Sequence, residues 1–160
     1  MKMKRVNEIF QHPRYQECLK EIGLLEEGRK FCRHTPEHFL DVARITCLLA
    51  WERGMEVNRE TVYAAGLLHD IGRAEQYRRG TPHEQAGAAI AGEILPDCGF
   101  SKEEQEEILN LIRSHREKEA ETDLAGLFYR ADKLSRNCFS CPAEGECDWP
   151  KEKKNREISC

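Results

Sequence analysis

The chain has 160 residues, a length that suits one domain with its own hydrophobic core. Its formal net charge of −4 excludes a broad basic surface for extended nucleic acid, while a small basic pocket for a phosphate stays compatible with it. No apolar run reaches the roughly 20 residues of a membrane span, and none follows the basic start as a secretory signal would require. These features predict a cytoplasmic protein with no membrane partner.

Almost the whole chain has the pattern of helices that begin at capping residues. Thr35 precedes a proline at the first helical position, and residues 81–84 and 101–104 fit the capping box. No alternating apolar and polar run predicts a strand. The expected helices lie near 13–27, 36–53, 59–70, 82–95, 102–117 and 123–137.

The fold class that follows is all-α, a compact bundle of about five or six helices. We expect residues 1–137 to form the helical domain. The residues after it change character, with prolines, a glycine and a charged run. Residues 138–160 are therefore expected to be a separate cysteine-rich appendage.

Five of the expected helices each carry one histidine or aspartate on the face that should point into the core. Residues three or four apart share a helix face, which places these polar groups in apolar stripes. A sixth polar residue, Asp70, comes directly after one of them. The five residues on the stripes are His38, His69, His83, His115 and Asp132.

Considered singly, each of these side chains is more often a hydrogen-bonded core residue or a helix cap than a metal ligand. An unsatisfied buried polar group costs about 1–3 kcal/mol, so six unpaired groups would cancel much of a domain's net stability of roughly 5–15 kcal/mol. A shared metal centre satisfies all of them with one feature. Imidazole and carboxylate ligands suit iron, manganese, zinc or nickel better than calcium.

Three strings carry a resemblance to a known family: HFLDVAR at 38–44, GLLHDIG at 66–72 and ADKL at 131–134. In this order they resemble the HD superfamily of metal-dependent phosphohydrolases, over residues 34–136. The resemblance implies that His38, His69, Asp70 and Asp132 bind a divalent transition metal. It implies iron first, with manganese, zinc, nickel or cobalt as the other candidates.

Members of that family with two metals have two further histidines between the His-Asp pair and the final aspartate. His83 and His115 stand in those places, and Asp70 would then bridge the metals as the catalytic carboxylate. The chain lacks the Gly-Tyr-Pro motif of the cyclic dinucleotide phosphodiesterases. It is more similar to compact dinuclear members that resemble symmetrical dinucleoside tetraphosphate hydrolases.

The resemblance implies hydrolysis of a phosphoester or phosphoanhydride of a nucleotide or dinucleoside polyphosphate by metal-activated hydroxide. Arg73, Lys133 and His34 are the candidate contacts for substrate phosphate. Each has an alternative role. Arg73 would be a solvated charge at a helix end, Lys133 would orient Asp132, and His34 would be a cap or a surface residue.

Two other functions use the same residues. Some proteins of this fold hold a mixed-valence di-iron centre with the same six ligands and are oxygenases. A non-enzymatic nucleotide-binding regulator is the third hypothesis. The sequence indicates neither the base and phosphate number of a substrate nor the oligomeric state.

The chain holds eight cysteines, which in a reducing cytosol do not predict a disulfide framework. Four of them form a C-x2-C-x5-C-x12-C array near the carboxyl end. Such thiolates suit a structural zinc ion or an iron–sulfur cluster, and the alternative is a reduced tail without metal. The candidate ligands are Cys138, Cys141, Cys147 and Cys160.

Overall fold

The computed structural model describes residues 1–116 and 121–159, and every regular element in these two ranges is a helix. This confirms the all-α fold class. Three 3-10 turns lie in the tail: η1 (Cys138–Ser140), η2 (Glu144–Glu146) and η3 (Lys151–Lys153). The α-helices are α1 (Lys4–Gln11), α2 (Pro13–Leu25), α3 (Pro36–Glu52), α4 (Arg59–Leu68), α5 (Arg73–Arg79), α6 (His83–Asp97), α7 (Lys102–Ser114) and α8 (Leu124–Leu134).

The six expected helices are α2, α3, α4, α6, α7 and α8, and two short helices, α1 and α5, were not predicted. Helix α1 buries Val6 and Ile9 and is separated from α2 by Pro13, which begins the second helix. Helix α5 has 7 residues and ends at Gly80, whose φ of 73° is favourable for glycine. A helix this short depends on its neighbours and leaves little periodic signal.

Most of the predicted helix starts are confirmed. The Thr35 side chain accepts a hydrogen bond from the backbone N–H of His38, and residues 101–104 form the full capping box. The box expected at residues 81–84 is wrong, because Pro82 is the residue before α6 and no side chain caps that helix.

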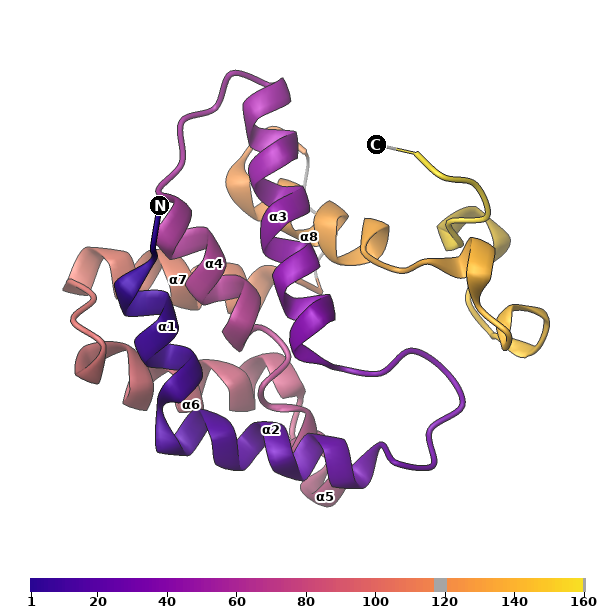
Figure 1. Cartoon of the computed structure of the whole chain (residues 1–160), viewed down its shortest axis with the longest axis horizontal. Helices are drawn as coiled ribbons and strands as arrows, with labels where there is room; N and C mark the ends of the chain where they lie inside the picture. Colours follow the sequence, from indigo (N-terminus) through magenta and orange to yellow (C-terminus); the bar gives the residue numbers. More distant parts are fainter. Residues whose placement is uncertain (117–120, 160) are drawn as a thin grey trace.

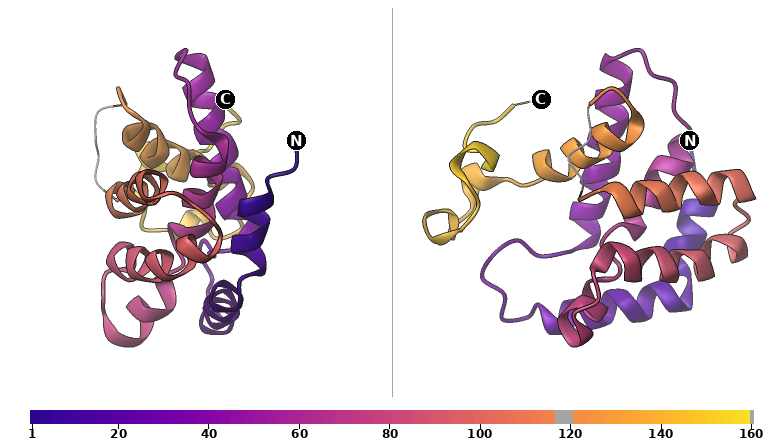
Figure 2. Two further views of the ribbon diagram at one scale, coloured as in Figure 1. Left: turned by 90° about the vertical axis from the view of Figure 1, so that its left-hand side faces the viewer. Right: turned by 180° about the vertical axis from the view of Figure 1, so that it is seen from behind.

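Helix α3 runs through the middle of the molecule, with α4 packed on one side and α8 on the other (Figure 1). Helices α6 and α7 lie together, and α7 also contacts α4 and α8. The view from behind shows α6 and α7 side by side (Figure 2). Gly66 allows α3 and α4 to approach, because a Cβ there would lie 2.8 Å from the Cβ of Ala43.

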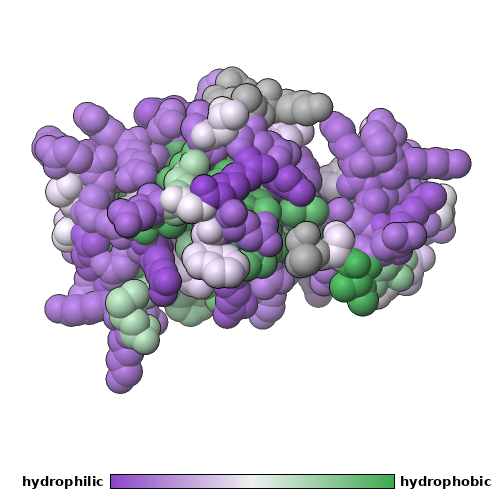
Figure 3. Space-filling model, turned by 90° about the horizontal axis from the view of Figure 1, so that it is seen from above, coloured by the Kyte–Doolittle hydropathy of each residue, from purple (hydrophilic) through white to green (hydrophobic). Residues whose placement is uncertain are grey.

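The tail after residue 137 forms a small lobe beside the helical body (Figure 1). Asn155 fastens it by donating to the backbone oxygens of Lys133 at 2.8 Å and Arg136 at 2.7 Å. The surface seen from above is mostly hydrophilic (Figure 3). No helix in the described ranges is long and apolar enough to cross a membrane.

Candidate metal centre

The structure brings together the six histidines and aspartates that the helix faces predicted. His38 lies in the first turn of α3, His83 begins α6, and His115 follows the last residue of α7. His69 and Asp70 follow α4, while Asp132 lies on α8. All six are buried. Five helices thus deliver polar side chains to one point in the core.

The six side chains form two groups that share Asp70. One group is His38, His69, Asp70 and Asp132, and the other is Asp70, His83 and His115. Within each group the potential ligand atoms all lie within 4.8 Å of one another. This spacing is what a single ion needs from its ligands.

Each carboxylate oxygen of Asp70 faces a different group. Its Oδ2 lies 3.2 Å from Nε2 of His69 and 3.5 Å from Nε2 of His38. Its Oδ1 lies 3.1 Å from Nε2 of His83 and 3.7 Å from Nε2 of His115. Asp70 therefore occupies the position of a bridging ligand.

The outer nitrogen of each histidine is held by an acceptor. Nδ1 of His69 donates to the backbone oxygen of Gly66 at 2.7 Å, and Nδ1 of His115 donates to that of Ile112 at 2.6 Å. A carbonyl oxygen only accepts, so both Nδ1 atoms carry the proton. In the neutral ring, Nε2 then presents a lone pair to the centre.

Two further residues orient the other histidines and were missed in the sequence. Oγ of Ser135 donates to the backbone oxygen of Asp132 at 2.7 Å and accepts Nδ1–H of His38 at 3.0 Å. Oε1 of Gln76 lies 2.9 Å from Nδ1 of His83. Ser135 comes one helical turn after Asp132 on α8, a spacing that could have revealed it.

The inward nitrogens of His69, His83 and His115 lack hydrogen-bond donors. Nε2 of His69 is buried without any hydrogen-bond partner. Nε2 of His83 lies 3.0 Å from Nε2 of His115, where two lone pairs would repel each other. Two nitrogens bound at about 2.1 Å to one ion and at right angles to each other are about 3.0 Å apart. The donor set therefore fits a transition metal.

Charge at the centre also favours a cation. Burial alone would raise the pKa of both aspartates, but the surrounding histidines hold the pKa of Asp70 and of Asp132 well below the usual range. Burial alone would lower the pKa of His69, but the carboxylates of Asp70 and Asp132 outweigh the effect of burial and raise this pKa to about 9. Burial lowers the pKa of His83 to about 4, which keeps its imidazole neutral and able to bind a metal.

Two guanidinium groups reach the ligand atoms. Nε of Arg73 donates to Oδ1 of Asp70 at 3.0 Å, so Arg73 is not a solvated charge at a helix end. Arg136, which sequence reasoning missed, contacts Nε2 of His38 at 3.1 Å. Both arginines lie where positive charge is favourable, and both line the pocket above the centre.

The other two predicted phosphate contacts also lie at the centre. Lys133 places Nζ 2.5 Å from Oδ2 of Asp132, so it orients that ligand. His34 is buried, so its interpretation as a surface residue is wrong. Its Nε2 lies 3.6 Å from Oδ2 of Asp70, and its Nδ1 bonds to Glu26.

A pocket of about 440 Å³ opens above the centre, lined by His34, His115 and Asp132. It is strongly basic although the chain is acidic overall, since only Asp132 and Asp148 are acidic in its lining. Trp149 and other tail residues form one wall. The basic residues that line it are Arg29, Arg73, Arg116, Lys133, Arg136 and Lys153.

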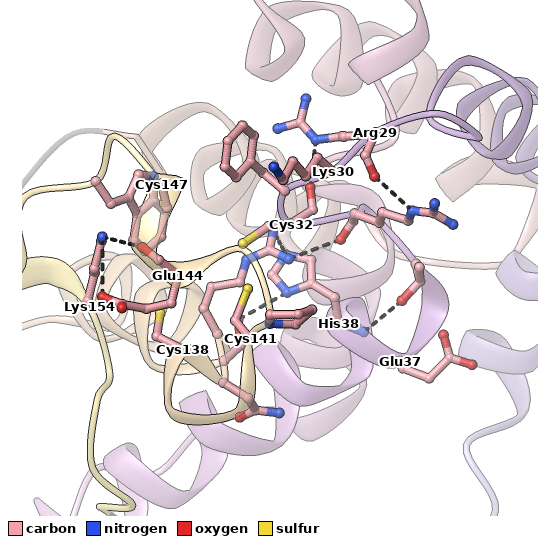
Figure 4. Close-up of a pocket in the computed structure, with 18 of the residues that line it drawn as sticks. Arg29, Lys30, Cys32, Glu37, His38, Cys138, Cys141, Glu144, Cys147 and Lys154 are labelled. Carbon is pink, nitrogen blue, oxygen red and sulfur yellow. Dashed lines mark hydrogen bonds and ion pairs between the residues drawn. The ribbon is translucent and has the colours of Figure 1, made fainter.

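The cysteines of the tail lie around a neighbouring pocket (Figure 4). Cys138, Cys141 and Cys147 line it together with Cys32, which comes from the loop between α2 and α3. The fourth predicted tail ligand, Cys160, lies outside the described residues.

The chain is similar in sequence to known proteins. The HD domain family matches residues 35–137. An uncharacterized protein of Clostridium beijerinckii is 46% identical over 156 residues, which cover 98% of this chain and 99% of that protein. Ribonuclease Y of Mycoplasma mycoides subsp. mycoides SC is 34% identical over 120 residues, which are 74% of this chain and 22% of that protein.

The fold also has a solved counterpart. The crystal structure of a predicted HD superfamily hydrolase from an uncultured Thermotogales bacterium superposes with a TM-score of 0.60 and 24% sequence identity. The match covers 93% of this chain and 86% of that one. It therefore includes most of the helical body that carries the six histidines and aspartates.

Proposed function

Because this chain belongs to the HD domain family, we propose that it is a metal-dependent phosphohydrolase that cleaves a phosphoester or phosphoanhydride of a small nucleotide. One observation carries the proposal. Four buried histidines direct Nε2 toward two carboxylates, and Asp70 divides its oxygens between two ligand groups. Such an arrangement is suited to two metals, and without them Nε2 of His69 is buried with no hydrogen-bond partner.

Bound transition metals would supply a lowered pKa for water and would neutralise negative charge on the scissile phosphate. The residues of the first group, His38, His69 and Asp132, would hold one metal with Oδ2 of Asp70. Those of the second group, His83 and His115, would hold the other with Oδ1. The acceptors on Nδ1 fix the orientation of each imidazole before any ligand arrives.

The basic residues of the pocket support a phosphorylated substrate. Arg73 and Arg136 reach the ligand atoms from the pocket side, and a guanidinium binds two phosphate oxygens with parallel hydrogen bonds. Lys133 holds Asp132 and lies 5.0 Å above the Tyr129 ring, at the same opening. His34 lines this opening and, with Nδ1 bound to Glu26, presents Nε2 to a substrate.

The size of the pocket favours a compact substrate. A volume of about 440 Å³ suits one nucleotide with its phosphates, so the second half of a dinucleoside polyphosphate would extend out of the pocket, and the tail closes one side. Dinucleoside tetraphosphates are the first candidates. The similarity to ribonuclease Y adds short single-stranded RNA to the substrates to be screened.

The test begins with protein stripped by a chelator and reloaded, without oxygen, with iron, manganese, zinc, nickel or cobalt. Release of phosphate or nucleotide is then measured from dinucleoside polyphosphates, mononucleotides and short RNA. Activity should return with metal and disappear in Asp70→Asn, whereas Asp97→Asn, at an exposed position, should keep it. Activity that survives complete metal removal would contradict the proposal.

The same preparations separate the two other functions. Oxygen consumption by the iron-loaded protein, without phosphate release from any substrate, would favour the di-iron oxygenase. A nucleotide that binds tightly and is never hydrolysed with any metal would favour the regulator.

A further inference from the structure

Four cysteines from two distant parts of the chain meet beside the catalytic pocket. Cys138, Cys141 and Cys147 come from the tail, and Cys32 comes from the loop between α2 and α3 (Figure 4). All four line one pocket of about 480 Å³. None is in a disulfide, and all are half-buried, so their thiols are available as ligands.

All four thiols line the same pocket, so a negative charge on one of them acts on the others. Four thiolates this close together are unfavourable unless a cation offsets their charge. Cys32 is therefore part of the cysteine cluster, although no sequence spacing connects it to the tail.

The tail has almost no hydrophobic core of its own. Ala143 is the one buried residue among residues 138–159. The segment nevertheless keeps an ordered path of three 3-10 turns. Segments below about 40 residues that cannot bury apolar surface usually need a disulfide or a metal. Since no disulfide is present in the described chain, a metal is one source of order that would add to the hydrogen bonds of Asn155.

The turns of the tail present its cysteines to one side. Cys138 begins η1, and its carbonyl oxygen accepts from the backbone N–H of Cys141 at 3.2 Å. Cys147 follows η2 and donates its N–H to Glu144 at 3.3 Å. A C-x2-C turn of this kind places two thiolates on one metal group.

The spacing of the sulfurs favours one occupant over another. In a tetrahedral zinc site with Zn–S bonds of about 2.3 Å, the sulfurs would lie about 3.8 Å apart. The two groups of three or more potential ligands within 4.8 Å in the described chain contain no cysteine. No three of the described sulfurs therefore lie within 4.8 Å of one another, which is a wider spacing than one zinc ion requires. An iron–sulfur cluster separates its ligands, because each thiolate binds a different iron.

Basic residues around the pocket match the charge of such a cluster. The side chain of Lys154 is only 6% exposed, and it pairs with Glu144. Arg29, Lys30, Arg33 and Arg136 also line the pocket, and with Lys154 they outnumber its three acidic residues, Glu37, Asp41 and Glu144. A cluster with four thiolate ligands has a net negative charge, so these cationic side chains would stabilise the cluster.

We propose that Cys32, Cys138, Cys141 and Cys147 are the four ligands of a [4Fe–4S] cluster that fastens the tail to the helical domain. The cluster would also fix one wall of the catalytic pocket, since Cys147 and Trp149 line both pockets. This second consequence rests on the proposed hydrolase function. The cluster itself does not, and it is tested without any activity measurement.

The protein is purified without oxygen and reconstituted with ferrous iron and sulfide, and acid-labile sulfide, iron, zinc and visible absorption are measured. About four sulfides per chain are expected. Cys32→Ser and Cys138→Ser should lose the sulfide and the absorption. Cys47→Ser, at a half-buried cysteine of α3 outside the pocket, and Cys160→Ser should retain both.

Three results would overturn the assignment: sulfide retained in Cys32→Ser, sulfide lost in Cys160→Ser, or zinc bound with no sulfide. Far-UV circular dichroism and manganese binding to the histidine centre verify that each variant is folded. Limited trypsin digestion gives a measurement that needs no variant. Reconstitution should slow cleavage after Lys151, Lys153 and Arg156 at least tenfold, and an unchanged rate would contradict the proposal.

Discussion

The substitution Gly72→Ala tests how closely α6 must approach the His-Asp turn. Gly72 has ordinary backbone angles, φ −80° and ψ 1°, so any cost comes from space alone. A Cβ at this position would lie 2.2 Å from the backbone oxygen of His83 and 2.4 Å from the backbone N of Gly87. Ordinary contact begins at 3.4 Å, so α6 would have to retreat by more than one ångström.

This displacement of α6 should disturb the ligand group of His83 and His115 more than the group of His38, His69 and Asp132. Overpacking a tight interface costs about 1–3 kcal/mol, and at this chain length each kcal/mol lowers Tm by roughly 2–4 °C. His83 would also move away from Oδ1 of Asp70, now 3.1 Å from its Nε2. A displacement of about 1 Å at a catalytic site lowers the rate about 100-fold.

The assay combines thermal unfolding, metal titration and turnover. Gly72→Ala should unfold at lower temperature and lose one of two metals, and its turnover should fall about 100-fold. Gly92→Ala is the matched control in α6, because nothing lies within 4 Å of its added Cβ. It should be more stable than the wild type by about 0.4–1 kcal/mol. Unchanged stability with two metals bound in Gly72→Ala would refute the reasoning.

Three other variants test individual contacts. Ser135→Ala removes the acceptor of His38 Nδ1 and should weaken metal binding about 10- to 100-fold by calorimetric titration, whereas Ser140→Ala should not change it. Arg73→Ala should raise KM for a phosphate substrate about tenfold or more at similar kcat, and an equal fall in kcat would contradict a binding role. Burial would raise the pKa of Glu26, but hydrogen bonds from His34 and Tyr77 lower it from 4.5 to about 2. Its contribution, roughly 3 kcal/mol, is therefore present above pH 4.5 and lost as pH falls toward 2. Denaturant unfolding should show that the free energy of unfolding of Glu26→Gln falls less between pH 4.5 and 2 than that of the wild type. An equal fall in both proteins would exclude the contribution.

The helix faces and the caps made most of the fold predictable from the sequence. Thr35 and Ser101 mark helix starts by local hydrogen bonds, which depend on neighbours in sequence alone. The histidines and aspartates were visible because each interrupts an apolar stripe. Helix α5 was missed because its stability comes from contacts with α2 and α6 rather than from its own pattern.

The residues that support the site were harder to predict. Gln76 lies on the missed helix α5, and Arg136 has no pattern that distinguishes it from other surface arginines. Cys32 is isolated in sequence, so only the folded chain shows that it lies with the tail cysteines. Contacts between distant segments are set by packing, which a local pattern does not encode.

Manganese titration followed by electron paramagnetic resonance tests the central claim most directly, because thiolate sites bind manganese poorly. The wild type should bind about two ions per chain with the signal of a coupled pair, since the two ligand groups share Asp70. His83→Ala should bind one ion with the signal of isolated manganese, and Asp70→Asn should bind little. A single uncoupled ion in the wild type, unchanged in His83→Ala, would contradict the dinuclear centre.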